Sequence, residues 1–145
     1  MSATANGEAG TGDGALVGIV LVSHSAAVAR SVAELAGDLV AGGPAVPVAA
    51  AGGTPDGALG TSAELIAAAA RSVDRGAGVA LIADLGSSVL TVKALLLDEE
   101  LPAGSRLLDA PFLEGAVAAV VTAATGAPLD AVAAAAGEAY AYRKV

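Results

Sequence analysis

The stretch LVGIVLVSHSAAVAR, residues 16–30, joins an apolar run to a helical pattern, and this junction determines the fold that we expect. From Leu16 to Ser23 the apolar residues do not alternate with polar ones, which predicts a strand buried on both faces. From Ala26 onward apolar residues recur at three- and four-residue spacing, as one face of a helix requires. These residues are Val28, Val32, Leu35 and Leu39. His24, the only histidine in the chain, lies at the turn between the two elements.

The rest of the chain repeats this alternation of apolar runs and helical segments. Further strands are predicted at residues 46–50, 78–84 and 106–109, and helices at residues 26–41, 61–75, 88–98, 113–125 and 129–141. Strands that alternate with helices form a parallel sheet with right-handed crossovers. We therefore predict a single three-layer α/β domain with a mostly parallel central sheet, strand order 2-1-3-4, and helices on both faces.

Local signals mark several helix ends. Two glycines and a proline at residues 42–44 end the first helix. Residues 61–64, Thr-Ser-Ala-Glu, have the pattern of a capping box in which either hydroxyl is the cap. Pro128 suits the first turn of the last helix.

Composition limits the class of protein. The 145 residues are 55% hydrophobic but only 2% aromatic, so the core must be built from Ala, Val and Leu with close helix–sheet contacts. The net charge of −8 disfavours nucleic acid and anionic membrane surfaces as partners, because both attract positive charge. It is compatible with a basic protein partner, or with solubility alone. With no cysteine, disulfides, thiol catalysis and cysteine metal sites are excluded.

The first residues lack the features of a secretory signal peptide. Residues 1–14 are rich in Gly, Ala and Thr and lack the basic and apolar regions of a signal peptide. We expect a disordered tail there and a folded domain over residues 15–145. No apolar run reaches the roughly 18 residues needed to span a membrane. Together with the absence of cysteine, this favours the cytoplasm.

Residues that carry chemistry follow the first and third strands. Ser-His-Ser at residues 23–25 ends the first strand, and Asp-Leu-Gly-Ser-Ser at residues 84–88 follows the third. In the order 2-1-3-4 these strands are neighbours whose crossovers lie on opposite faces, so their carboxyl ends flank a crevice. We expect His24 and Asp84 to converge there. Asp84 would accept a hydrogen bond from one ring nitrogen and leave the other free to attack phosphorus.

Donors for phosphoryl oxygens surround this pair. The candidates are the Ser25 hydroxyl with the N–H groups of the first helix, and Gly86, Ser87 and Ser88 at the third helix. Asp84, Ser87 and Ser88 equally suit helix capping, and the 52–60 loop fits a lid, a phosphate loop or a long surface turn.

The chain has no Walker motif, no G-x-G-x-x-G after the first strand and no nucleophile elbow. One histidine without cysteine disfavours a transition-metal site, so we expect no cofactor and no metal.

Three local patterns resemble one known family, the mannose-type enzyme IIA domains of the bacterial phosphotransferase system. They are GIVLVSHS at residues 18–25, ADLGSS at residues 83–88 and LDAPFLEG at residues 108–115. The first is similar to the segment with the family's phosphorylated histidine, and the second to the segment with the aspartate that orients it. The third is similar to a stretch of the dihydroxyacetone branch, the DhaM proteins. Residues 83–88 also lack the second glycine and the proline of the sugar-transport branch.

The resemblance implies a phosphotransferase subunit that forms a homodimer. HPr, phosphorylated from phosphoenolpyruvate through enzyme I, would phosphorylate His24 on Nε2, the ring nitrogen not bonded to Asp84. The phosphoryl group would pass to ADP on the DhaL subunit, which would phosphorylate dihydroxyacetone held by DhaK. Two other hypotheses stay open. One is an enzyme IIA that feeds a sugar permease, and the other is a non-catalytic regulatory module that binds partners and thereby reports phosphorylation.

Overall fold

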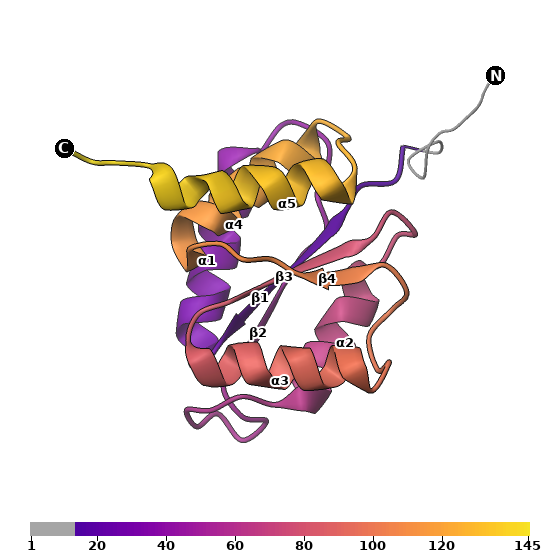
Figure 1. The fold of residues 1–145 in the computed structure, drawn as a ribbon, viewed down its shortest axis with the longest axis vertical. Coiled ribbons are helices and arrows are strands. Elements are labelled where there is room, and N and C mark those ends of the chain that lie inside the picture. Colours follow the sequence, from indigo (N-terminus) through magenta and orange to yellow (C-terminus); the bar gives the residue numbers. More distant parts are fainter. Residues whose placement is uncertain (1–13) are drawn as a thin grey trace.

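The central sheet has four parallel strands in the order β2-β1-β3-β4, as predicted (Figure 1). The structure is a computed structural model, and it describes residues 14–145. The strands are β1 (Gly18–Ser23), β2 (Val48–Gly52), β3 (Val79–Ala83) and β4 (Ser105–Leu107). The predicted tail, residues 1–14, lies outside the described residues apart from Gly14.

Helices cover both faces of this sheet, which makes the predicted three layers. They are α1 (Ala26–Leu39), α2 (Ala63–Val73), α3 (Gly86–Leu97), α4 (Phe112–Ala124) and α5 (Leu129–Glu138), followed by the short 3₁₀ helix η2 (Ala139–Ala141). Helices α1, α4 and α5 cover one face, and α2 and α3 cover the other (Figure 1). Within residues 14–145 none of the helices is both long and apolar enough to cross a membrane.

The two apolar clusters of the core lie on opposite sides of the sheet, and β1 contributes to both. Ile19 and Leu21 pack in the cluster under α1 and α4, while Val20 and Val22 pack in the cluster over α2. Successive side chains of a strand point to opposite faces, so burial on both faces explains the uninterrupted apolar run. The predicted close contacts are also present. A Cβ on Gly18 would lie 2.2 Å from a backbone oxygen of α2.

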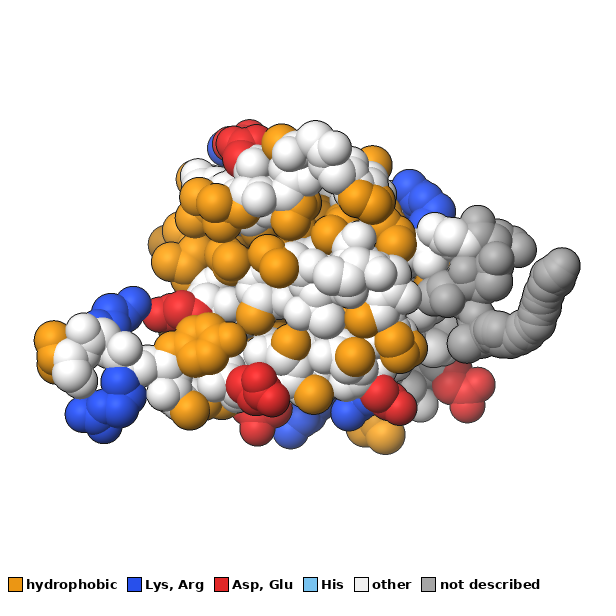
Figure 2. Space-filling view, turned by 90° about the horizontal axis from the view of Figure 1, so that it is seen from above, with side chains coloured by type: hydrophobic (Ala, Val, Ile, Leu, Met, Phe, Trp, Pro, Cys, Tyr) orange, Lys and Arg blue, Asp and Glu red, His pale blue; other side chains and the backbone are white. Residues whose placement is uncertain are grey.

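The apolar spacing in α1 marks the buried face of this helix only in part, because Val32 packs against the core but the other three predicted residues are exposed. Ala29 and Ala36 are completely buried, whereas Val28, Leu35 and Leu39 are 45%, 44% and 58% exposed. Small side chains let the helix backbone approach the sheet closely, so the larger residues lie at the flank of the contact. Figure 2 views the molecule from the side of α5 and shows hydrophobic side chains on that face.

Several element ends differ from the predictions by two residues. Helix α2 has Ser62 as its N-cap, whose hydroxyl accepts from the Leu65 N–H at 3.2 Å. Glu64 is then the second helical residue rather than the third, so the predicted capping box does not form. Strand β2 begins at Val48 because the preceding Pro47 has no N–H for the sheet. Helix α3 begins at Gly86 rather than at residue 88, which places Gly86 and Ser87 in its first turn.

Candidate functional site

The register between β1 and β3 brings His24 and Asp84 together. Val22 pairs with Ala83, so the residues that follow the two strands continue side by side. The Asp84 N–H donates to the Val22 carbonyl at 3.0 Å and extends this pairing by one step. His24 Nδ1 then lies 3.1 Å from Asp84 Oδ1. The two segments thus converge at the sheet edge that the strand order indicates.

Asp84 is surrounded by hydrogen-bond donors besides the imidazole. Oδ2 accepts from the Ser23 hydroxyl at 2.8 Å and from the His24 N–H at 3.1 Å. Oδ1 accepts from the Leu85 N–H at 2.7 Å and from the Ser88 hydroxyl at 2.9 Å. Oδ2 is therefore held from the end of β1, and Oδ1 is held from the segment that follows β3.

These donors keep the carboxyl group of Asp84 ionised. Partial burial by itself raises the pKa of Asp84, because burial penalises the charged form. The hydrogen bonds from the His24 N–H, the Ser23 and Ser88 hydroxyls and the Leu85 N–H outweigh burial, and they lower this pKa from 3.8 to about 2. Asp84 thus carries a negative charge at neutral pH.

An ionised Asp84 determines the tautomer of His24. A carboxylate only accepts hydrogen bonds, so Nδ1 carries the proton that it donates to Asp84 Oδ1. In the neutral imidazole Nε2 is then the nitrogen with the free lone pair, and its neighbour is the exposed Ser87 hydroxyl. The His24 side chain is 24% exposed. The arrangement presents one nucleophilic nitrogen at the surface and holds the other against a negative charge.

The four residues predicted to contact a phosphoryl group lie at different places around the ring. Ser87 contacts Nε2, on the open side. The Ser25 hydroxyl is the N-cap of α1 and accepts from the Val28 N–H at 3.2 Å. Gly86 has nothing within 4 Å of where a Cβ would lie, so space is open beside the first turn of α3. The Ser88 hydroxyl is buried on the Nδ1 side, where it donates to Asp84.

The loop over residues 53–60 is attached to the backbone of the site. The Gly53 N–H donates to the Ser23 carbonyl at 3.1 Å, and the Gly60 N–H donates to the His24 carbonyl at 3.0 Å. Between these anchors Leu59 is 79% exposed. The loop thus supports the backbone of the residues around His24 and places a large apolar side chain at the surface next to Gly60.

Alanine substitutions at two glycines beside the site are expected to have different effects on the free energy of unfolding. A methyl on Gly52 would lie 2.4 Å from the Ser25 carbonyl oxygen, so Gly52→Ala should lower the free energy of unfolding. We expect a loss of about 1–3 kcal/mol, the usual cost of overpacking. Gly86→Ala is the matched control, with open space and a helical position. It should leave stability unchanged or raise it by up to about 1 kcal/mol. Urea denaturation measures both, and equal stabilities would contradict this account.

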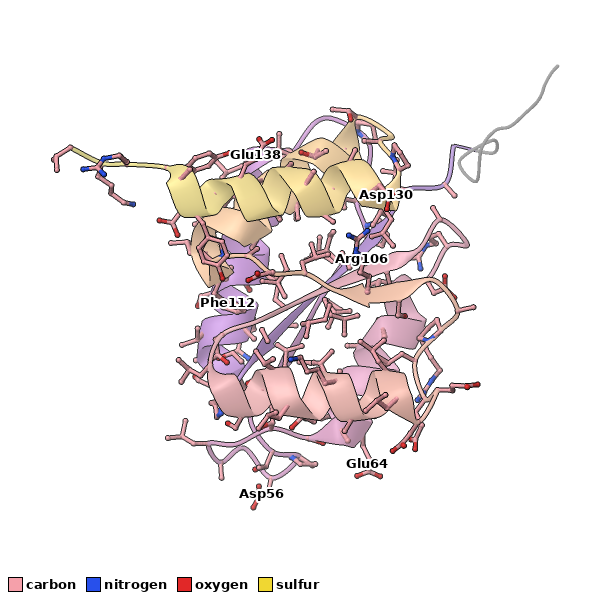
Figure 3. All side chains as sticks on the ribbon, viewed as in Figure 1. Asp56, Glu64, Arg106, Phe112, Asp130 and Glu138 are labelled. Carbon is pink, nitrogen blue, oxygen red and sulfur yellow. The ribbon has the colours of Figure 1, made fainter. Side chains whose placement is uncertain are left out.

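A cavity of about 650 Å³ lies next to Asp84 on the side of β4 and α4. Its lining includes Lys93, Asp109, Phe112 and Tyr140 as well as Asp84 itself. Burial raises the pKa of the Tyr140 hydroxyl, as does its hydrogen bond to Asp109. Figure 3 shows Phe112 at the beginning of α4, on the side of the molecule that this cavity occupies. His24 is not part of the lining, so the cavity adjoins the histidine site without containing it.

Two surface ion pairs connect the last elements to the rest of the domain. Glu114, in the first turn of α4, pairs with Lys144 at 3.1 Å, and this contact lowers the Glu114 pKa. Arg106 on β4 pairs with Asp130 on α5 at 2.7 Å, and Figure 3 shows the two side chains facing each other. Exposed pairs of this kind add little to stability. The two ion pairs account for the orientation of the Glu114 and Arg106 side chains, and neither pair belongs to the candidate site.

Ser23 belongs to the site, although the sequence patterns indicate for it only the end of the first strand. Its hydroxyl donates to Asp84 and it is 1% exposed. A signal for it does exist. If the strand order places β1 beside β3, the residue that follows Val22 in the paired register must lie next to Asp84.

The fold and this pair define an α/β protein in which a carboxylate orients a single histidine at the carboxyl edge of a parallel sheet. The chain belongs to the EIIA-man family, described as "PTS system fructose IIA component", which it matches over residues 18–133. This match confirms the family resemblance seen in the three sequence patterns.

Several proteins similar to this chain are named as DhaM phosphoryl-donor subunits. The chain is 36% identical over 108 residues to "PEP-dependent dihydroxyacetone kinase 2, phosphoryl donor subunit DhaM" of Listeria innocua, covering 73% of this chain and 85% of that protein. It is 37% identical over 120 residues to the DhaM subunit of Escherichia coli, covering 81% of this chain but only 25% of that longer protein.

Solved structures show the same architecture. The crystal structure of the unknown function protein EF1359 has a TM-score of 0.70 and 30% identity, and the match covers 84% of this chain and 93% of that one. A sigma-54 interaction domain protein from Enterococcus faecalis has a TM-score of 0.56 over 81% of this chain and 85% of that one. At 17% identity, the second likeness concerns the fold alone.

Proposed function

We propose that this chain is a phosphohistidine carrier that serves as the phosphoryl-donor subunit of a phosphoenolpyruvate-dependent dihydroxyacetone kinase. The observation that carries the proposal is the single histidine, with Nδ1 held by an ionised Asp84 and Nε2 facing outward. Family membership supports the phosphotransfer chemistry. The names of the DhaM relatives support the kinase, since the match to the Listeria innocua protein covers most of both chains.

The proposed reaction uses His24 twice, as acceptor and then as donor. The lone pair of Nε2 attacks the phosphorus of the incoming phosphohistidine while the donor nitrogen leaves with the bonding electrons. The new phosphoimidazole keeps its proton on Nδ1 and carries positive charge, which the Asp84 carboxylate stabilises at 3.1 Å. In the second step an oxygen of the acceptor attacks the same phosphorus, and Nε2 leaves as neutral imidazole. No proton has to move on His24 in either step.

Nearby donors would stabilise the phosphoryl oxygens. We assign this role to the Ser87 hydroxyl, which already contacts Nε2, and to the backbone around Gly86 at the beginning of α3. Ser25 would contribute its hydroxyl proton, because its oxygen accepts from the Val28 N–H as the cap of α1. The position of Ser88 instead suits the support of Asp84.

The proposed partners come from the family. HPr would be the phosphoryl donor and DhaL-bound ADP the acceptor, with DhaK holding the substrate in the same cytoplasmic pathway. The chain would act as a homodimer. Nucleic acid and membranes are not among the proposed partners, in keeping with the net charge of −8.

The proposal is tested by intact mass measurement of the purified protein incubated with phosphoenolpyruvate, enzyme I and HPr. A single acid-labile phosphoryl adduct is expected, and it should disappear when DhaL with bound ADP is added. An adduct that persists with DhaL but is passed to a mannose-type IIB protein would identify an enzyme IIA of a sugar permease instead. The family description as a fructose IIA component is the observation that favours this second candidate. No adduct would contradict both.

A further inference from the structure

Ser23 is unusual because polar side chains are rarely buried in this molecule. Among the described residues 14–145 only two polar residues are buried, Ser23 at 1% and Ser88 at 0% exposure. Both hydroxyls donate to the same carboxylate, that of Asp84. Burial of a hydroxyl costs free energy unless it is hydrogen-bonded, and an apolar residue would suit the end of a buried strand better. The hydrogen bond to Asp84 therefore accounts for a serine, rather than an apolar residue, at the end of β1.

The two hydrogen bonds of Ser23 connect three parts of the site. Its hydroxyl donates to Asp84 Oδ2 at 2.8 Å and accepts from the Ser25 N–H at 3.0 Å. Ser25 is the N-cap of α1, so one oxygen atom joins the end of β1, the beginning of α1 and the carboxylate that follows β3. The position of Asp84 relative to His24 is thereby fixed from the histidine's own strand.

This arrangement divides the two oxygens of Asp84 between different tasks. Oδ2 is held by the Ser23 hydroxyl and the His24 N–H, which leaves Oδ1 turned toward Nδ1. Without the Ser23 bond, Oδ2 keeps only the His24 N–H, whereas Oδ1 keeps the Leu85 N–H and the Ser88 hydroxyl, so the carboxylate is held less firmly on the side of β1 and its angle to the ring changes. We propose that Ser23 is a positioning residue that orients Asp84 and thereby keeps the proton of His24 on Nδ1. The proposal rests on the phosphorylation of His24 proposed above.

The test compares Ser23→Ala with the wild-type protein, using phosphoramidate as a small phosphoryl donor that needs no partner protein. Loss of a hydrogen bond to a charged group should slow phosphorylation roughly tenfold or more. The ¹⁵N chemical shifts of His24 should show that the Nδ1–H tautomer is no longer the sole form. The pKa of Asp84 should rise because the carboxylate has lost a donor. A purely structural role of Ser23 would change neither the tautomer nor this pKa.

Two further variants separate the hydroxyl from simple packing. Ser23→Thr keeps the hydroxyl and should restore the rate and the tautomer. Ser105→Ala is the matched control. Ser105 lies on β4 and is only half-buried as a residue, but its Oγ is inaccessible and has no hydrogen-bond partner within residues 14–145. It should behave as wild type. If Ser23→Ala does not fold, Ser23→Cys takes its place, since a thiol has a similar shape but is a weak donor.

The proposal is overturned if Ser23→Ala, or Ser23→Cys in its place, has the wild-type rate and tautomer. It is equally overturned if the threonine variant is as slow as the alanine variant, because the hydroxyl is then not the cause. The NMR measurements require neither HPr nor DhaL. A failure of the proposed relay would therefore appear in the mass experiment above and would leave these readouts intact.

Discussion

Replacing His24 with alanine is expected to abolish phosphorylation completely while the domain remains folded. His24 is the only histidine, so no other imidazole can take over as acceptor. Its side chain is 24% exposed and contributes no part of either apolar cluster. Asp84 keeps four other hydrogen bonds after the ring is removed, so the carboxylate is not left unpaired. The measurement is intact mass after incubation with phosphoenolpyruvate, enzyme I and HPr, with thermal unfolding of the same sample.

A glutamine at the same position provides the control for packing. His24→Gln places an amide near Asp84 but offers no nucleophilic nitrogen, so it should be as inactive as the alanine variant. A folded His24→Ala protein that still gains an acid-labile phosphoryl group would show that the reactive residue lies elsewhere. Loss of phosphorylation together with loss of the thermal transition would instead indicate that the ring is needed for folding.

The fold was accessible from the sequence because its strands are buried on both faces. An apolar run such as residues 16–23 has little other explanation when turns and helical segments follow at regular intervals. Once the strands alternate with helices, the right-handed crossover rule leaves few strand orders, and the order with β1 beside β3 predicts where the site lies. The closeness of His24 and Asp84, 60 residues apart in sequence, follows from that order together with the register of the two strands.

Side-chain detail was less accessible, for reasons that particular residues make clear. In α1 the spacing predicts a packed face of Val28, Val32, Leu35 and Leu39. Of these only Val32 packs against the core, and the fully buried residues of the helix are Ala29 and Ala36. Alanine is apolar on every face of an alanine-rich helix, so hydropathy cannot give the rotation of that helix. The role of Ser23 follows from the strand order only when the register between β1 and β3 is also known to the residue, and the strand order does not set that register.

Asp84→Asn is expected to reduce phosphorylation of His24 by roughly 10²- to 10⁴-fold, the range seen when an oriented carboxylate or an oxyanion donor is lost from other sites. Asparagine removes the negative charge that stabilises the phosphorylated ring. It also presents an NH₂ group to an environment of donors, namely the Ser23 and Ser88 hydroxyls and two backbone N–H groups. Asp130→Asn is the matched control, since it removes the same charge on α5 and should leave the rate unchanged. The rate of appearance of the phosphoryl adduct by intact mass measures both variants.

The same variant should show how stability depends on pH. The pKa of Asp84 in the folded protein is about 2, below its ordinary value of 3.8, so the charged form favours the folded state. This stabilisation is fully present above about pH 4 to 5 and is lost as the pH falls toward about 2. The difference in unfolding free energy between wild type and Asp84→Asn should therefore be constant near neutral pH and shrink in that acidic window. Urea denaturation between pH 2 and pH 6 measures it, and a difference that stays constant down to pH 2 would mean that the donors around Asp84 do not hold it ionised.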